Sequence, residues 1–284
     1  MIAPPIAIAR GDDDYPAALL DLPDPPITLW RIGSLDLLRG PVVAIVGTRK
    51  ASTYGERVAR EIAGSLARHG ACVLSGMARG IDGVAHVAAL DASGKTAAVL
   101  GTGVDIAYPP SHRALHRRIA TSGLLLSELA PGAHSHGGSF PQRNRLIAAL
   151  AKLTIIIEAP VKSGALITAR HAQELNRDLG VVPGPIDSPQ SEGSNLLFRD
   201  GAHPITSAAD ALSLVGLTPA VRTLNDPEDP DQSRVWQALR EGPADLDTLC
   251  HRAALPVQRC LAAVTALELN GSIECALTGE VRKR

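Results

Sequence analysis

Residues 75–82 (SGMARGID) have the composition of an anion-binding corner. They follow the short apolar run 71–74 and open a helix-like run that ends near Leu90. Where a parallel strand gives way to a helix, backbone N–H groups point outward and the helix dipole favours negative charge. Two glycines and Arg79 at such a corner could therefore hold a phosphate. A glycine turn that merely closes a strand–helix unit is the alternative, and neighbouring segments must decide between the two.

A second cationic segment occupies residues 140–145 (FPQRNR). The sequence predicts a helix over 143–151, with Arg143 and Arg145 at its start, where cations oppose the helix dipole. Two arginines in that position indicate an external anion, because a guanidinium can grip phosphate bidentately or stack on a base. Phe140 could offer a stacking face to one base, or it could be an ordinary core aromatic. Aromatic residues are only 2% of the chain, which excludes a broad stacking platform.

Motifs for catalysis and metal binding are weaker. Residues 93–96 (SGKT) mimic the end of a P-loop but precede a predicted strand, and 101–103 (GTG) lack the third glycine of a dinucleotide fingerprint. The histidines within 134–136 have no partner at metal-ligand spacing. Asp82 and His86 could form an acid–base pair, although a helix cap and local packing are the favoured interpretation. We therefore expect no catalytic residue, no metal and no cofactor.

Composition limits the classes of protein to consider. The chain has 284 residues, of which 45% are hydrophobic, enough for one large or two smaller domains. The net charge is −1, but residues 42–216 carry 17 basic and 13 acidic side chains, a mild pointer to an anionic ligand. The four cysteines show no CxxC spacing and the start lacks a signal-peptide pattern, so a cytoplasmic location is expected. No apolar run approaches the roughly 18 residues of a membrane span.

Alternating apolar and helix-like segments organise residues 42–216. The alternation repeats about six times, which predicts a doubly wound, mostly parallel α/β sheet. Strands are expected at 42–46, 71–74, 96–100, 124–126, 153–157 and 179–182, and helices at 54–69, 81–92, 111–121, 143–151 and 165–176. The carboxyl ends of parallel strands share one edge, where small residues leave room for a ligand. Such residues lie at 47–49, 75–76, 101–103, 127–128, 158–159 and 183–184.

The two flanks of this region read as separate parts. Residues 1–41 predict a lead-in that packs on the core, with Leu29, Trp30 and Ile32 as candidate anchors. Residues 217–230 predict a linker. Residues 231–284 predict a winged helix-turn-helix, with helices at 233–240, 245–253 and 257–270 and a hairpin within 272–281. The balanced charge of this last part favours a protein-contact or dimerisation module over a phosphate binder.

Ordered blocks between residues 12 and 216 resemble the DNA processing protein A (DprA, or Smf) family of bacteria. The blocks are Tyr15-Pro16, VAIVGTR at 43–49, SGMARGID at 75–82, AVLGTG at 98–103, Tyr108-Pro109, Ser127-Glu128, FPQRNR at 140–145, Glu158-Ala159, SGALITA at 163–169 and Pro183-Gly184. The tail resembles the winged-helix domain that often closes family members. The resemblance implies an extended Rossmann-like domain that binds single-stranded DNA, and a protein that is not an enzyme.

The resemblance also implies partners and a site. Family members load the RecA recombinase onto incoming DNA in natural transformation, help displace single-strand-binding protein, and form homodimers; a role in DNA repair is equally open. Many members begin with a small helical domain of the sterile-alpha-motif type, and this chain, which starts almost at the Tyr15-Pro16 block, is expected to lack it. Carried over by position, the implied DNA site comprises Gly47, Thr48, Arg49, Ser52, Ser75, Gly76, Arg79, Gly80, Phe140, Arg143, Asn144, Arg145, Lys152, Ser163 and Gly164.

Two other functions remain open from the sequence. A Rossmann-like enzyme on a small nucleotide, such as a phosphoribohydrolase, would suit the glycine corners, but its Pro-Gly-Gly-x-Gly-Thr loop is missing: SFP at 139–141 follows Gly137-Gly138. A transcription regulator could read duplex DNA through the tail, but the predicted helix 257–270 holds one basic residue, Arg259, which is thin for major-groove recognition.

Overall fold

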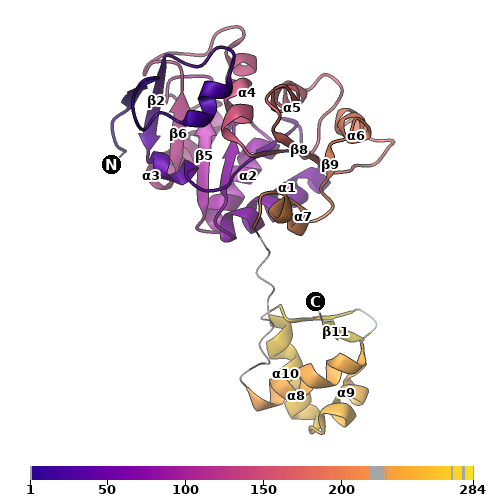
Figure 1. Cartoon of the computed structure of the whole chain (residues 1–284). Coiled ribbons are helices and arrows are strands. Elements are labelled where there is room, and N and C mark those ends of the chain that lie inside the picture. Colours follow the sequence, from indigo (N-terminus) through magenta and orange to yellow (C-terminus); the bar gives the residue numbers. More distant parts are fainter. Residues whose placement is uncertain (1, 218–226, 228, 270, 277–278, 284) are drawn as a thin grey trace. The chain divides into compact units, whose positions relative to one another are not determined.

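A nine-stranded sheet forms the centre of the larger of two units, which are divided between residues 219 and 220 (Figure 1). The computed structural model describes residues 2–217, 227, 229–269, 271–276 and 279–283. The strand order is β1-β2-β6-β5-β4-β3-β7-β8-β9, and every pair from β6 to β9 in this order is parallel. The predicted doubly wound, mostly parallel α/β sheet is confirmed. The strands are β1 (Ile6–Ala9), β2 (Thr28–Gly33), β3 (Val42–Val46), β4 (Cys72–Ser75), β5 (Lys95–Val99), β6 (Leu124–Ser127), β7 (Leu153–Ile156), β8 (Asp178–Val181) and β9 (His203–Pro204).

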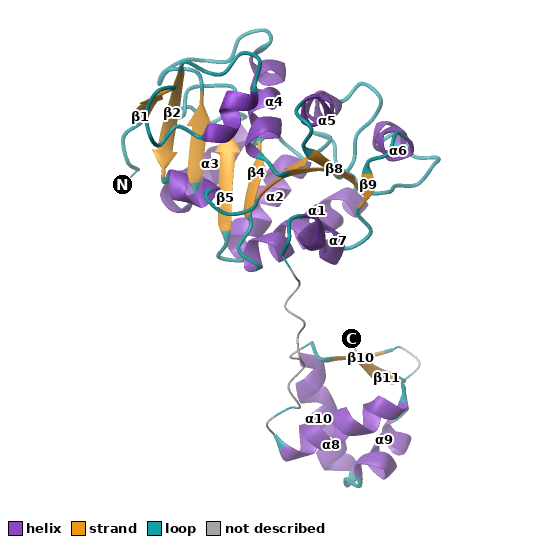
Figure 2. Cartoon of the chain, in the orientation of Figure 1, coloured by secondary structure: helices purple, strands orange, loops and turns teal. Residues whose placement is uncertain are grey.

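Helices cover both faces of this sheet (Figure 2). One face carries α1 (Thr53–Arg68), α2 (Ile81–Asp91), α3 (Arg113–Ser122) and α7 (Ala208–Leu214); the other carries α4 (Ser139–Leu150), α5 (Gly164–Glu174) and α6 (Glu192–Arg199). Val43 and Ile45 pack toward α1 and α2, whereas Ala44 and Val46 pack toward α4 and α5. Burial on both faces explains why the strands are continuous apolar runs. None of the helices in the described residues combines the length and apolar character that a membrane crossing requires.

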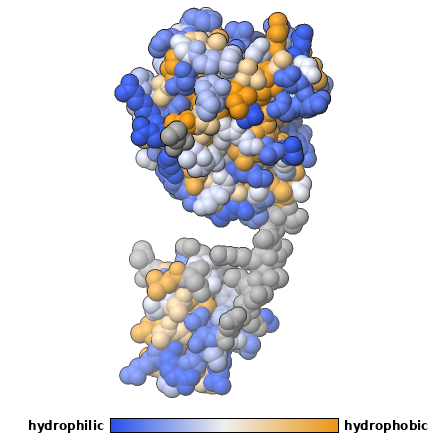
Figure 3. Space-filling view, turned by 90° about the vertical axis from the view of Figure 1, so that its left-hand side faces the viewer, coloured by the Kyte–Doolittle hydropathy of each residue, from blue (hydrophilic) through white to orange (hydrophobic). Residues whose placement is uncertain are grey.

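The amino-terminal segment, expected as a lead-in, contributes two strands to the sheet. β1 pairs antiparallel with β2, and β2 pairs antiparallel with β6, from Trp30 opposite Ser127 to Gly33 opposite Leu124. The expected anchors Leu29 and Ile32 are buried, and Trp30 is partly buried. Leu29 packs into the core on one face and Ile32 into the core on the other, so β2 shows no alternating pattern in the sequence. Figure 3 shows the side of the larger unit on which β1 and β2 lie in Figure 1, where apolar surface is interspersed with hydrophilic surface.

The order in which strands are added reverses between β3 and β7. From β3 the chain adds β4, β5 and β6 on one side, then crosses over to add β7, β8 and β9 on the other. In open α/β sheets, ligands bind outside the carboxyl ends of the strands at such a reversal. The residues that follow β3 and β7 therefore hold the position best suited to a ligand.

The smaller unit has the order of elements that the sequence predicts for a winged helix. It comprises α8 (Pro230–Ala238), α9 (Leu246–Ala253), α10 (Val257–Leu269), β10 (Ile273–Cys275) and β11 (Val281–Lys283). Trp236, Leu249 and Leu267 lie in its core. Most of the predicted linker (218–226 and 228) and part of the predicted hairpin (277–278) lie outside the described residues. Short 3-10 helices complete the two units at Ala17–Asp21, Leu35–Leu38, Pro110–His112 and Leu239–Glu241.

If β2 is an integral strand, truncating its core side chain should destabilise the whole larger unit. Leu29 is 0% exposed, and Leu29→Ala should lower the free energy of unfolding by about 2–5 kcal/mol through lost burial and a residual cavity. Ile27, two residues earlier, is 74% exposed, and Ile27→Ala should change it by less than about 0.5 kcal/mol. Urea unfolding followed by circular dichroism measures both. Equal, small effects would show that β2 is not part of the cooperative core.

Candidate functional site

A depression of about 310 Å³ lies at the carboxyl ends of β3 and β7, where the strand order reverses. The turn after β3, the first turns of α4 and the start of α5 line it. A smaller hollow of about 40 Å³ shares Arg49, Ala78, Phe140 and Arg143 with it. Between them, the two hollows bring together ten of the residues expected at the site: Gly47, Thr48, Arg49, Gly76, Arg79, Phe140, Arg143, Asn144, Ser163 and Gly164.

Three cationic side chains with exposed surface line these hollows. They are Arg49 after β3, Arg79 before α2 and Lys162 before α5. The Arg49 guanidinium lies 5.5 Å from the centroid of the Phe140 ring, which in turn lies 4.9 Å from that of Tyr108. Cations beside aromatic rings suit a ligand that carries both phosphates and bases.

Tyr108 and Lys162 line the hollows but were not among the residues expected at the site. Tyr108 lies in the segment between β5 and α3, well away in sequence from the predicted cationic runs, and it reaches the site through its ring contact with Phe140. Lys162 had a usable signal, because it directly precedes the Ser163-Gly164 helix start that was assigned to the site.

Arg143 lines both hollows but is only 5% exposed. Its guanidinium donates hydrogen bonds to the carbonyl oxygens of Gly76, at 2.8 Å, and Val99, which lie at the ends of β4 and β5. Burial lowers the pKa of Arg143 to about 10, and the neighbouring Asp82 carboxylate opposes this shift. The predicted helix start at residue 143 is corrected: α4 begins at Ser139, so Arg143 lies in its second turn and bonds to the strand ends.

The corner at residues 75–82 is filled by the chain's own carboxylate. Asp82 accepts hydrogen bonds from the N–H groups of Gly76, at 3.1 Å, and Ala78, at 3.3 Å, and the Ser75 hydroxyl donates to Ile45 O at 2.6 Å. Burial raises the pKa of Asp82, while Arg143 and these hydrogen bonds oppose the shift. These N–H groups are not free for an external phosphate, so the corner contributes to the site chiefly through Arg79.

Gly80 and Ser52 line neither hollow, but they contact the segments that do. Gly80 has a φ of +75°, and a Cβ there would lie 2.4 Å from Thr48 O, so the corner and the turn after β3 touch at a glycine. Ser52 donates its hydroxyl and its N–H to the carboxylate of Glu158, which follows β7.

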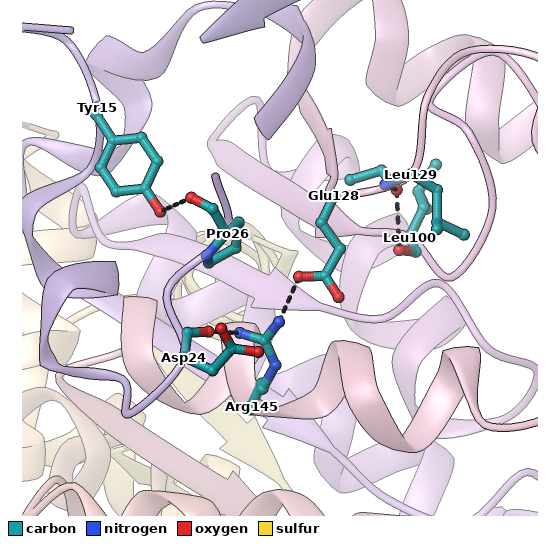
Figure 4. A network of polar contacts seen from close by, with 8 residues as sticks. Tyr15, Asp24, Pro26, Leu100, Glu128, Leu129 and Arg145 are labelled. Atoms are coloured by element: carbon teal, nitrogen blue, oxygen red, sulfur yellow. Dashed lines mark hydrogen bonds and ion pairs between the residues drawn. The ribbon is translucent and has the colours of Figure 1, made fainter. Parts of the chain in front are cut away.

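Arg145 and Lys152, also expected at the site, line neither hollow and contact other parts of the chain. Arg145 pairs with Glu128 at 2.5 Å and donates to Asp24 O at 2.9 Å, tying α4 to the amino-terminal segment (Figure 4). Burial raises the pKa of Glu128, and Arg145 opposes the shift. Lys152 precedes β7, at the end of the strand opposite to the depression, and donates to Val215 O at 3.4 Å.

His86 belongs to the buried layer under the site. Its Nδ1 lies 2.7 Å from the Thr96 hydroxyl, which itself donates to Val73 O, so Nδ1 carries the proton. Nε2 has no hydrogen-bond partner among the residues that the structure describes. Burial, and secondarily Arg143, lower the pKa of His86 to about 3. These contacts agree with local packing of His86 rather than an acid–base role with Asp82.

The loop histidines show no metal site. His134 and His136 are exposed, and within the described parts of the chain no group of three or more His, Cys, Asp or Glu side chains is placed to hold a metal ion.

These features define an extended Rossmann-like protein with a cationic, aromatic site at the strand reversal, joined to a winged-helix unit. Residues 7–216 match the family model of DNA recombination-mediator protein A, and residues 219–276 match that of the DprA winged helix domain. The chain therefore belongs to the DprA/Smf family, as the sequence blocks suggested.

Several relatives extend this comparison. The chain is 37% identical to Protein Smf of Synechocystis, over 96% of this chain and 75% of the relative. It is 40% identical to the structure of DNA processing protein A from Streptococcus pneumoniae, with a TM-score of 0.71 over 73% of each chain. A structure of DNA processing protein A from Helicobacter pylori, described for its single-stranded DNA binding mode, is 34% identical, with a TM-score of 0.68 over 74% of this chain and 94% of the other.

His86 should make the stability of the larger unit sensitive to acid. The pKa of His86 is about 3 in the folded chain and ordinarily 6.5, so below pH 6.5 the unfolded chain binds a proton that the folded chain does not bind. The free energy of unfolding should fall by up to about 1.4 kcal/mol per pH unit from this group. His86→Asn can still donate to Thr96 and should lose this part of the slope, which urea unfolding at pH 7, 6 and 5 measures. Identical slopes in both proteins would rule the assignment out.

Proposed function

We propose that this chain is a cytoplasmic, non-enzymatic protein that binds single-stranded DNA along the depression at the carboxyl edge of the sheet. The observation that carries the proposal is the set of exposed cations, Arg49, Arg79 and Lys162, around hollows that also contain Phe140 and Tyr108. Phosphates pair with the cations and an unstacked base can lie on an aromatic ring, a combination that a single strand offers more readily than a duplex. Membership in the DprA/Smf family supports it.

The chemistry of the lining favours binding over turnover. Asp82 is the acidic residue among those that line the larger hollow, and it is 5% exposed and already bonded to two backbone N–H groups. A hydrolase acting on a small nucleotide needs an accessible base or nucleophile near its substrate. The depression offers cations and small residues instead, which supports a binding protein over a phosphoribohydrolase-like enzyme.

Loading of the RecA recombinase, displacement of single-strand-binding protein and homodimerisation complete the proposal. They rest on family membership and give the protein a role in natural transformation or DNA repair. In the winged-helix unit, Arg259 of α10 forms two hydrogen bonds with Asp231, at 2.6 and 2.7 Å. A basic side chain held in this way is poorly placed to read a groove, which favours contact with protein over duplex recognition.

Removing an exposed cation should weaken binding and make it less dependent on salt. Each contact of a cation with single-stranded DNA contributes roughly 0.7 to the slope of log affinity against log salt. Arg49→Ala and Lys162→Ala should each lower that slope by about this amount. Lys152→Ala, an exposed cation at the opposite end of β7, is the control and should change neither slope nor affinity. Titration of fluorescent oligo-dT at several salt concentrations tests this. A loss for Lys152→Ala equal to that for Arg49→Ala would place the DNA elsewhere.

Recombinase loading can be measured separately. On oligo-dT coated with single-strand-binding protein, the wild-type chain should shorten the lag before RecA hydrolyses ATP, because it supplies a nucleation point on the strand. Arg49→Ala should shorten the lag much less at the same concentration. An unchanged lag with the wild-type chain would refute the loading role and leave DNA binding standing.

A further inference from the structure

We propose that Glu158 is a positioning residue that holds the loop carrying Arg49 and so acts on the DNA site through Arg49. This inference rests on the proposed function. In the sequence, Glu158 stands out only as part of the Glu158-Ala159 block at the end of a predicted strand. Its side chain is 2% exposed and it lines neither hollow, so it reaches the ligand only through other residues.

Glu158 grips the loop on both sides of Arg49. Its backbone carbonyl accepts the N–H of Thr48 at 2.7 Å, directly before Arg49. Its carboxylate accepts the N–H of Ser52 at 2.9 Å, together with the Ser52 hydroxyl. The ends of the loop that follows β3 are thereby anchored on the residue that follows β7, and Arg49 projects between the two anchors.

The carboxylate also fits a space that only a glycine leaves open. A Cβ at Gly55, in the first turn of α1, would lie 2.3 Å from Oε2 of Glu158 and 2.5 Å from its Cδ. Gly55 itself donates its N–H to the Ser52 hydroxyl at 3.0 Å. The backbone of α1, Ser52 and Glu158 therefore form one packed unit, in which the carboxylate has no room to shift without moving the loop.

A buried carboxylate near a DNA site would by itself repel the phosphates of the ligand, so its presence there calls for a structural role. Hydrogen bonds to an ionised carboxylate are shorter and stronger than neutral ones. Here they offset the cost of burying the charge and make the loop rigid. A loop fixed before the ligand arrives avoids the ordering entropy that binding would otherwise cost. Arg49 then meets the DNA already placed beside Phe140.

A double-mutant cycle with Arg49 tests the assignment. Glu158→Gln removes the charge with little change of shape, and it should weaken oligo-dT binding by about tenfold, the equivalent of one side chain left to be ordered on binding. In an Arg49→Ala background, Glu158→Gln should cause no further loss of affinity, although it should lower the melting temperature in both backgrounds. Equal losses of affinity in both backgrounds, or no loss in either, would overturn the proposal.

Gly55→Ala provides a second route if Glu158→Gln does not fold. It should weaken binding by displacing the carboxylate, again only when Arg49 is present. The matched control is Gly64→Ala in the same helix, where a Cβ would lie 3.3 Å from the flexible end of Arg68 and 3.9 Å, an ordinary contact distance, from Ala88 O. Gly64→Ala should bind as the wild type does. A loss in Gly64→Ala as large as in Gly55→Ala would mean that any change in α1 disturbs the site, and would overturn the assignment to Glu158.

Hydrogen exchange separates this inference from the proposed function. Without DNA, the amides of Thr48 and Ser52 should exchange faster in Glu158→Gln and Gly55→Ala than in the wild type, while those of β8 remain protected. Unchanged exchange would show that Glu158 does not hold the loop. If the wild-type chain fails to bind oligo-dT while exchange rises as expected, the proposed function falls and the structural part of the inference stands.

Discussion

The buried guanidinium of Arg143 is the interaction on which the site depends. It joins α4 to the carboxyl ends of β4 and β5 through Gly76 O and Val99 O, and it neighbours the Asp82 carboxylate. A Cβ at Gly76 would lie 2.4 Å from this guanidinium, so the strand end is shaped around it. A buried charge left without its partner costs several kcal/mol. The opposite charges of Arg143 and Asp82 therefore offset each other's burial, between the elements that carry Phe140 and Arg79.

The cations at and near the site fall into two groups. Arg143 and Arg145 are largely buried and bonded to the chain itself, whereas Arg49, Arg79 and Lys162 keep exposed surface at the hollows. The first group ties α4 to the strand ends and to the amino-terminal segment, whereas the second is available to a ligand. Local composition alone gives a misleading impression of the site, because the fold bonds both arginines of the 140–145 segment internally.

Helices α6 and α7 and strand β9 were not predicted, but strands β3 to β8 and helices α1 to α5 were predictable because both faces of the sheet are buried and the apolar runs are uninterrupted. β2 was not, since its two buried side chains serve opposite faces. The edge that carries the site followed from the glycine-rich strand ends. The sequence did not show which hydrogen-bond donors are free at that edge, because their partners can be distant in sequence. Glu158, for example, is 106 residues from Ser52. A helix start placed four residues too late moved Arg143 from the second turn to the first, so its bonds to the strand ends were not predicted.

The small number of exposed cations limits how strongly one copy of the site can bind a polyanion. With three exposed cations at the hollows, the salt-dependent part of binding is that of about three phosphate contacts, well short of an extended groove. Two such sites on one strand would gain from effective concentration, since the second contact becomes intramolecular once the first is made. That gain needs no additional contact at either site. It gives the proposed homodimer a physical purpose, because two small, preorganised sites used together would hold the proposed single-stranded DNA ligand more firmly than one.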